Sequence, residues 1–349
     1  MSRDTKITDL PPKWRYPAEW EAHAATWLAW PFHRELWEEN LPAAQLEFVK
    51  LVEAISAGEK IKILGHNDDA ILEARAHLAH IKTVEYFHVP YGDIWVRDTG
   101  CLFYLNESER KLCAKTFSFN GWGEKYLFPE DPLIAAQMAS LAGVREPQRS
   151  EWIVEGGALE WDGKGNLLTT RQCLLNPNRK NSWRGDEGAV EDQIKRELGV
   201  SAVGWISEGL LNDHTDGHID TIVRFVAPGV AVCMEAQNSS DPQRDQLRGI
   251  LEDLKRIKLA DGSRLEIFTV PSPGAVLDEE GEVMPASYMN FYLGNDLVVV
   301  PTYECRADDS ALKALEPLFR GRQLTGTSSL AILSGGGSFH CITQQEPKL

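Results

Sequence analysis

A helical pattern followed by a strand pattern, repeated five times, is the feature that most constrains the fold of this 349-residue chain. Amphipathic helical patterns span Ala43 to Ala57, Pro132 to Leu141, Gly188 to Leu198, Gln243 to Ile257 and Ser310 to Phe319. Each is followed by a strand-like stretch, beginning at Ile61, Val144, Ser201, Arg264 and Gln323. An additional helix, Asp68 to His80, is inserted early in the series. The chain is therefore expected to repeat one α/β supersecondary unit five times.

A second series of five apolar stretches carries one polar or reactive residue each. These stretches, which we expect to be strands, are WVRD ending at Asp98, WIVE at Glu155, HID at Asp220, YMN at Asn290 and HC at Cys341. Successive members lie 57, 65, 70 and 51 residues apart, so the period is similar but the loops vary. A cyclic array of such units would bring one residue from each to a central axis. The sequence thus predicts one small pocket built from distant residues.

The repeats show no sign of division into separate domains. No low-complexity segment or linker interrupts them, and polar loops such as Asn176 to Asp186 and Asp278 to Gly281 are short. We therefore expect a single continuous domain over residues 1–349.

The charge balance restricts the partners that the protein can have. The chain holds 36 Lys and Arg against 52 Asp and Glu, a formal net charge of −16, which repels nucleic acid and anionic membrane surfaces but attracts small cations. No apolar run is long enough for a membrane helix, and the N-terminal MSRDTKITDLPPKW lacks the apolar stretch of an export signal. The expected location is therefore cytoplasmic. Six scattered cysteines without a C-x-x-C pair argue against a zinc ribbon or a disulfide framework.

The segment NDHTDGHIDTIVRF, residues 212–225, is the first candidate for chemistry. Its alternation, interpreted as a strand, places His218 and Asp220 on one face, where an imidazole beside a carboxylate forms an acid/base unit. The same alternation leaves a metal site open, because His214, Asp216, His218 and Asp220 could all contact one divalent ion.

The segment SGGGSFHCIT, residues 334–343, favours a nucleophile. Its glycines allow close backbone approach to a ligand, and Cys341 follows directly. A bound cationic substrate could lower the pKa of this thiol. His340 would face away from Cys341 on a strand and is interpreted as structural. A buried core thiol is the alternative reading of Cys341.

Two further segments offer carboxylates. In GDIWVRDTG, residues 92–100, Asp98 could accept a guanidinium through two hydrogen bonds while Trp95 supplies an apolar wall. The alternative is a surface ion pair of Arg97 with Asp98 beside a core tryptophan. Glu155, before two glycines, could orient His218 or bind the substrate, although turn chemistry alone explains the glycines.

Taken together, WVRDTG at 95, EGG at 155, DGHIDTIVRF at 216, ASYMNFY at 286 and GGGSFHCITQQEP at 335 resemble the agmatine deiminase family, relatives of bacterial peptidyl-arginine deiminases. The resemblance implies a five-bladed α/β propeller of ββαβ modules with pseudo-fivefold symmetry, and no metal or organic cofactor. Carried over by position, it implies Cys341 as nucleophile, His218 as general acid/base and Asp98 and Asp220 as carboxylates that hold the guanidinium. It also implies that Glu155 orients His218, and that Trp95 and Asn290 line the pocket.

The implied reaction converts agmatine and water to N-carbamoylputrescine and ammonia, a step in putrescine biosynthesis, through a covalent thiouronium intermediate on Cys341. The partner is then a small cationic guanidine, and a homodimer is the family-level expectation. Three alternatives stay open: a deiminase of peptidyl or free L-arginine with the same mechanism, a metal hydrolase, and a non-catalytic scaffold.

Overall fold

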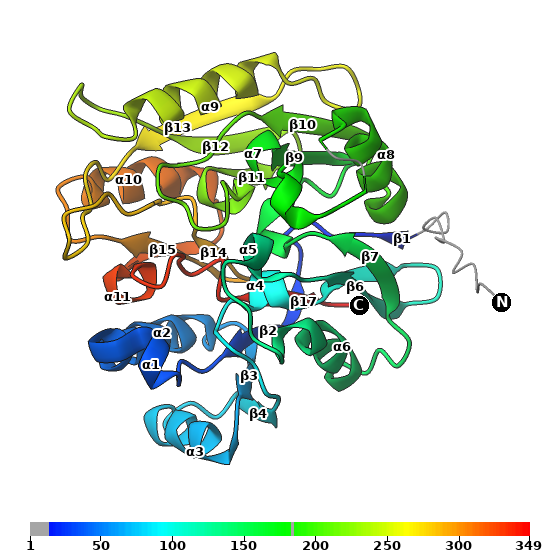
Figure 1. Ribbon diagram of the computed structural model, residues 1–349, viewed down its shortest axis with the longest axis vertical. Helices are drawn as coiled ribbons and strands as arrows, with labels where there is room; N and C mark the ends of the chain where they lie inside the picture. Colours follow the sequence, from blue (N-terminus) through cyan, green and yellow to red (C-terminus); the bar gives the residue numbers. More distant parts are fainter. Residues whose placement is uncertain (1–13, 183–184) are drawn as a thin grey trace.

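The computed structural model describes residues 14–182 and 185–349, a mixed α/β structure whose strands form five separate sheets (Figure 1). The first sheet contains β1 (Trp14–Arg15), β5 (Leu102–Asn106), β6 (Lys111–Ser118) and β7 (Gln148–Ile153). The second contains β10 (Ala202–Ile206), β9 (Asn166–Thr170) and β8 (Glu160–Trp161), and the third β11 (Val223–Ala227), β12 (Val230–Glu235) and β13 (Glu266–Pro271). The fourth contains β14 (Tyr292–Leu293), β15 (Leu297–Thr302) and β16 (Gln323–Ser328). The fifth contains β17 (Gln344–Pro347), β2 (His23–Ala29), β3 (Lys60–Gly65) and β4 (Val84–His88).

Every sheet is built on the same pairing pattern, an antiparallel strand pair extended by a parallel strand. The antiparallel pairs are β5–β6, β8–β9, β11–β12, β14–β15 and β17–β2. The parallel strands added to them are β7, β10, β13, β16 and β3. A parallel neighbour requires a crossover, and a helix provides it in each sheet. The predicted fivefold repetition of one α/β unit is therefore confirmed over the described residues.

The crossover helices lie where the apolar periodicity places them. They are α2 (Leu41–Ile55), α6 (Asp131–Leu141), α8 (Glu187–Leu198), α9 (Arg244–Arg256) and α10 (Asp308–Leu315), and the additional helix is α3 (Asp68–His77). In α9, for example, Leu247, Ile250 and Leu254 are buried at three- and four-residue spacing. Helix α8 begins after Asp186, whose side chain accepts from the backbone N–H of Ala189, and ends at Gly199 with φ 67°.

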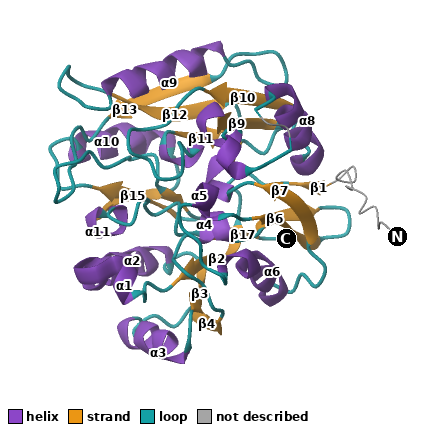
Figure 2. Ribbon diagram, viewed as in Figure 1, coloured by secondary structure: helices purple, strands orange, loops and turns teal. Residues whose placement is uncertain are grey.

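The remaining helices are short and several of them carry site residues. They are α1 (Arg34–Trp37), α4 (Val96–Thr99), α5 (Gly121–Glu124), α7 (Arg171–Leu174) and α11 (Leu330–Leu333), with the 3₁₀ turns η1 (Glu38–Asn40), η2 (Gly156–Ala158), η3 (Pro177–Arg179), η4 (Ile219–Thr221) and η5 (Glu316–Leu318). In Figure 2 the long helices α2, α6, α8 and α9 lie toward the outside, and α4 and α5 lie near the middle. Among the described residues, the apolar core forms three buried clusters rather than one.

Two sequence predictions fall partly outside the described residues. The N-terminal segment examined for an export signal lies outside them up to residue 13, and the predicted loop Asn176 to Asp186 includes residues 183 and 184, which are also outside. Within the described part of the chain, no helix combines the length and the apolar character needed to cross a bilayer.

Candidate active site

Three side chains from different parts of the chain converge on the backbone of Gly157. A Cβ atom at position 157 would lie 2.7 Å from His218 Nδ1, 2.8 Å from Asp98 Oδ1 and 3.0 Å from Asp220 Oδ2. Cys341 adjoins this group, because its Sγ lies 3.5 Å from Asp220 Oδ2. The absence of a side chain at Gly157 therefore leaves open the space that an imidazole and two carboxylates share.

Cys341 sits in a turn before β17 and is held by Asn290. The backbone N–H groups of His340 and Cys341 donate to Asn290 Oδ1 at 3.0 and 3.2 Å, and Asn290 Nδ2 donates to Cys341 Sγ at 3.0 Å. Burial, followed by the negative charges of Asp220 and Asp98, raises the pKa of the Cys341 thiol well above its ordinary value. Without a bound cation this sulfur is therefore a neutral thiol at physiological pH.

His218 precedes η4 and lies between two carboxylates. Its Nδ1 is 3.7 Å from Asp98 Oδ2 and its Nε2 is 3.8 Å from Glu155 Oε2. The side chain is 0 % exposed, and neither nitrogen has a hydrogen-bond partner among the residues that the structure describes. Burial lowers the pKa of His218, but the charge of Asp98 and contacts with Cys173 and Glu155 outweigh it and raise the pKa well above its ordinary value. The imidazole is therefore protonated and can donate a proton.

Glu155 is fixed by Arg179, a residue that the sequence reasoning missed. Arg179 Nε donates to Glu155 Oε1 at 2.8 Å, and its Nη groups donate to Asp216 Oδ2 at 2.5 Å and to the carbonyl of Thr215 at 2.7 Å. Burial would raise the pKa of Glu155, but the Arg179 charge brings it below its usual range. Arg179 thus ties the loop before His218 to Glu155. The only sequence signal was an arginine within a polar loop, where exposure is the usual expectation.

The two predicted clamp carboxylates have different surroundings. Asp98 accepts from Trp122 Nε1 at 2.8 Å and from the backbone N–H of Gly157 at 2.9 Å, and burial raises its pKa to about 6. Burial would also raise the pKa of Asp220, but the hydrogen bond from His340 Nδ1, at 2.7 Å, lowers it. Asp220 Oδ1 has no partner in the described structure, so it remains available to a ligand.

Several local expectations from the sequence were wrong. Asp98 lies in helix α4 and Asp220 in η4, not in strands; Glu155 follows β7, and Asn290 and Cys341 precede β14 and β17. Segments of three or four residues are too short for periodicity to separate strand from helical turn. His340 also does not face away from Cys341, because both side chains contact Asp220 Oδ2. The supposed surface pair is wrong as well: Arg97 is buried and donates to Gln345 Oε1.

The four alternating residues of the metal hypothesis do not converge on one point. The ring of His214 contacts the hydroxyl of Tyr126 at 3.1 Å, and Asp216 pairs with Lys125 and Arg179. His218 and Asp220 instead face Gly157. This arrangement contradicts a four-ligand site on the predicted strand face.

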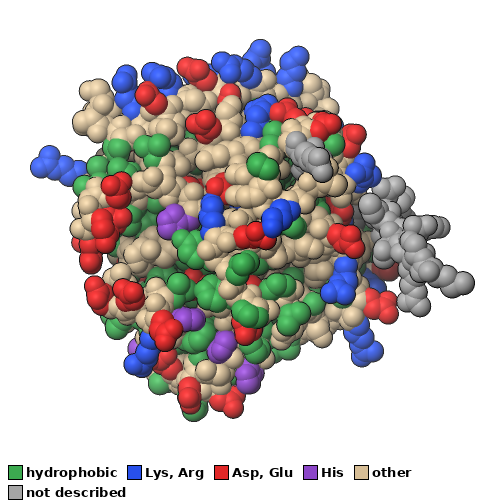
Figure 3. Space-filling model, viewed as in Figure 1, with side chains coloured by type: hydrophobic (Ala, Val, Ile, Leu, Met, Phe, Trp, Pro, Cys, Tyr) green, Lys and Arg blue, Asp and Glu red, His purple; other side chains and the backbone are tan. Residues whose placement is uncertain are grey.

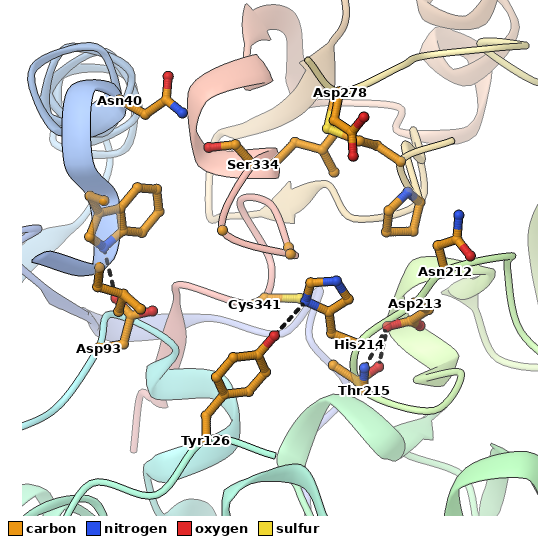
Figure 4. Close-up of a pocket in the computed structure, with 18 of the residues that line it drawn as sticks. Asn40, Asp93, Tyr126, Asn212, Asp213, His214, Thr215, Asp278, Ser334 and Cys341 are labelled. Carbon is orange, nitrogen blue, oxygen red and sulfur yellow. Dashed lines mark hydrogen bonds between the residues drawn. The ribbon is translucent and has the colours of Figure 1, made fainter. Parts of the chain in front are cut away.

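A cavity of about 1210 Å³ leads to the group, and Asp98 and Cys341 lie in its lining. Figure 4 shows Cys341 among other residues of this lining. Trp95 also lines it; its Nε1 donates to Asp93 Oδ2 at 2.6 Å, and its ring stacks on Trp37 with centroids 6.2 Å apart. The outer lining includes the acidic residues Glu38, Glu39, Asp278, Glu279, Glu280 and Glu282. Acidic side chains also gather on the left edge of Figure 3. The cavity therefore combines aromatic walls near the thiol with negative charge toward its mouth.

Comparison with known proteins places this chain in a family. Residues 15–347 match the model of the Porphyromonas-type peptidyl-arginine deiminases. A Legionella pneumophila strain Philadelphia 1 protein that bears the provisional name agmatine deiminase is 35% identical over 337 residues, covering 95% of this chain and 94% of that protein. The solved agmatine deiminase of Enterococcus faecalis has a TM-score of 0.89 at 28% identity, covering 96% of both chains. The C. jejuni agmatine deiminase with substrate bound has a TM-score of 0.87 at 25% identity, again covering 96% of both chains. With its mixed α/β fold shared and nearly its whole length matched, the chain belongs to the Porphyromonas-type peptidyl-arginine deiminase family.

Proposed function

We propose that this protein is an agmatine deiminase, a hydrolase that acts on a C–N bond of a linear amidine. The observation that carries the proposal is the convergence of the Cys341 thiol, the His218 imidazole and the carboxylates of Asp98 and Asp220 around one buried point. Relatives that bear the name agmatine deiminase cover nearly the whole chain.

In this proposal the two carboxylates bind the guanidinium before any bond changes. Asp98 Oδ1 and Asp220 Oδ2 both face the space beside Gly157, so a planar cation placed there can donate to both. Fixing the guanidinium carbon close to Cys341 Sγ makes the attack effectively unimolecular. The positive charge of the substrate also offsets the carboxylates that raise the pKa of the thiol, so binding favours loss of the thiol proton to solvent and formation of the thiolate.

The covalent step follows from the same positions. The Cys341 thiolate attacks the guanidinium carbon, and the tetrahedral intermediate loses one amino nitrogen, which takes a proton from His218 and leaves as ammonia. A thiouronium bound to Cys341 remains. His218, now neutral, accepts one proton from water, and the water oxygen bonds to the carbon. The C–S bond then breaks, the remaining hydroxyl proton passes to the departing Cys341 sulfur and restores the thiol, and the ureido product leaves. Glu155 orients the imidazole throughout.

The proposal extends to the architecture of the protein. We infer that the five sheets are the blades of a five-bladed α/β propeller of ββαβ modules within a single domain. The pairing pattern shared by the five sheets supports this inference. So does the convergence at Gly157 of Asp98, His218 and Asp220, which lie close to strands of different sheets. A cytoplasmic homodimer acting on a small cationic guanidine is part of the same proposal.

A second candidate is a deiminase of peptidyl or free L-arginine with the same mechanism. The cavity of about 1210 Å³ favours keeping it, because this volume exceeds what one small guanidine fills. The acidic outer lining favours agmatine, because a free carboxylate on the substrate would be repelled there.

One assay tests class and substrate together. Purified, chelator-treated protein is incubated with agmatine, L-arginine and an arginine-containing peptide, and ammonia and ureido product are measured. Turnover of agmatine in preference to the other two is expected, whereas preference for arginine or the peptide would establish the second candidate. Cys341→Ala and Cys341→Ser should abolish turnover with the fold intact by circular dichroism, and ammonia release at the wild-type rate from either would refute the mechanism.

A further inference from the structure

A second buried thiol lies behind the catalytic group, and the proposed reaction does not use it. Cys173 in α7 is 0 % exposed, and its Sγ lies 4.0 Å from Glu155 Oε2 and 3.6 Å from Arg179 Nη2. Glu155 Oε2 thus lies near two polar side chains, His218 and Cys173. The reaction proposed above explains the first of these neighbours but not the second.

The ligand atoms of Glu155, Cys173 and His218 all lie within 4.8 Å of one another. In residues 14–182 and 185–349 this is the one trio of His, Cys, Asp or Glu side chains with such spacing. Neither ring nitrogen of His218 has a hydrogen-bond partner there. The trio therefore contains an imidazole nitrogen without a hydrogen-bond partner, close to a carboxylate and a thiol that could also bind a metal ion.

The donor set and its spacing suit Zn²⁺. A thiolate, an imidazole and a carboxylate are the ligands that zinc takes in proteins, and around one tetrahedral ion such donor atoms lie about 3.3 to 3.6 Å apart. Here His218 Nε2 and Cys173 Sγ lie 3.8 and 4.0 Å from Glu155 Oε2. The three donor atoms, all within 4.8 Å of one another, would have to move closer together to reach bonding positions around one ion.

The charge of the donor set also suits the ion. A thiolate and a carboxylate together supply two negative charges, which balance the charge of Zn²⁺, and the imidazole binds as a neutral ligand. Binding would release the protons held by the thiol and the imidazole, since both must be deprotonated to bind metal.

We propose that Glu155, Cys173 and His218 form an inhibitory Zn²⁺ site. Bound zinc would hold His218 as a neutral ligand, so that the imidazole could neither protonate the leaving nitrogen nor accept a proton from water. Zinc binding itself is independent of the reaction catalysed; only the inhibition rests on the proposed function. The two can therefore fail separately.

Zinc binding to the chelator-treated chain tests the site without any reference to activity. Equilibrium dialysis should find one Zn²⁺ per chain in the wild type, in Cys341→Ala and in Cys233→Ser, a control for another fully buried thiol. Cys173→Ser should weaken binding by about 100-fold or more, since even altering residues that only support ligands costs about 10- to 100-fold. Bound Co²⁺ should give a thiolate-to-cobalt absorption band in the wild type and in Cys341→Ala, but not in Cys173→Ser.

Three results would overturn the proposed site. Equal zinc affinity in Cys173→Ser and in the wild type would show that Cys173 is not a ligand. Loss of the cobalt band in Cys341→Ala would show that Cys341 is the thiolate ligand instead. Absence of bound zinc in the wild type would show that the site does not exist. If Cys173→Ser fails to fold by circular dichroism, Glu155→Gln replaces it with the same expected loss. Binding of zinc without loss of deiminase activity would retain the site but refute its inhibitory role.

Discussion

Asp98 and Asp220 face one point, yet their proton affinities differ because their neighbours differ. Asp220 accepts a hydrogen bond from His340, which also contacts Glu19 Oε2 at 2.9 Å. Asp98 accepts hydrogen bonds only from neutral donors, Trp122 and the backbone of Gly157, and the His218 charge, 3.7 Å away, lowers its pKa less than burial raises it. Desolvation therefore dominates at Asp98 and raises its pKa, whereas at Asp220 the histidine outweighs it. One carboxylate of the pair gains a proton at mildly acidic pH and the other stays ionised.

This difference predicts an acid limit to activity. The pKa of Asp98 is raised to about 6, so its carboxylate gains a proton as pH falls through that value and no longer attracts a guanidinium. We expect kcat/KM for agmatine, measured from about pH 5 to about pH 9, to fall below about pH 6. Asp98→Asn should lower kcat/KM by more than ~2 kcal/mol and remove this acid limb. Asp220→Asn should lower it similarly but keep the limb; an unchanged limb in Asp98→Asn would contradict the assignment.

Cys341 should discriminate between reagents by charge. Because its pKa is raised by burial and two carboxylates, the free thiol reacts slowly with a neutral haloacetamide. A haloacetamidine of the same size carries the amidinium charge that the two carboxylates attract, and should therefore inactivate at least about 10-fold faster at pH 7. Asp98→Asn should reduce this preference. Equal rates for both reagents in the wild type would show that the carboxylates do not act on the thiol.

At the scale of elements, the long helices were predictable and the site segments were not. Helix α9 contains three apolar residues at helical spacing, so its position follows from burial of one face. Helix α4 and turn η4 have four and three residues, and their conformation depends on contacts with η2, which is distant in sequence. The identities of Asp98, Asp220 and Cys341 came from motif and resemblance. The buried role of Arg179 was missed, because no local pattern signals a partner brought close only by folding.

The η2 turn allows a test that separates site from stability. Gly157→Ala would place its methyl 2.7 Å from His218 Nδ1 and 2.8 Å from Asp98 Oδ1, inside normal contact distance and in the space assigned to substrate. We expect kcat/KM to fall at least about 100-fold, since misplacement by about 1 Å costs that much. Gly249→Ala in α9 meets open space and should raise stability by about 0.5 to 1 kcal/mol without affecting kcat/KM. Wild-type kcat/KM in Gly157→Ala would mean that substrate lies elsewhere.

At the scale of the whole molecule, Arg224 in β11 connects several sheets from a fully buried position. Its guanidinium pairs with Glu19 Oε2 at 2.5 Å and Glu160 Oε2 at 3.2 Å, and donates to the carbonyl of Phe291 at 2.8 Å. Of these partners, Glu19 precedes β2, Glu160 lies in β8 and Phe291 precedes β14. Glu19 also contacts His340, so the same network reaches the site residue Asp220.

Loss of this cation should destabilise the protein as a whole. Arg224→Met leaves Glu19 and Glu160 buried without their cation, which costs about 3 to 5 kcal/mol. Urea unfolding should show this as a lower midpoint. Arg248→Met, which removes an exposed pair with Asp245, should change the free energy of unfolding by less than about 0.5 kcal/mol. Equal midpoints for the two variants would contradict the role of the network.

The pairing of β17 with β2 has a consequence for synthesis. These strands come from opposite ends of the described chain, and Glu346 on β17 accepts from Trp27 Nε1 on β2 at 2.9 Å. Cys341 lies just before β17, so during translation its thiol emerges from the ribosome after every other residue assigned to the site. Domains generally fold as units once their residues have emerged. A nascent chain therefore carries the acidic half of the proposed site long before it acquires the proposed nucleophile, and we expect activity to begin only after β17 docks on β2.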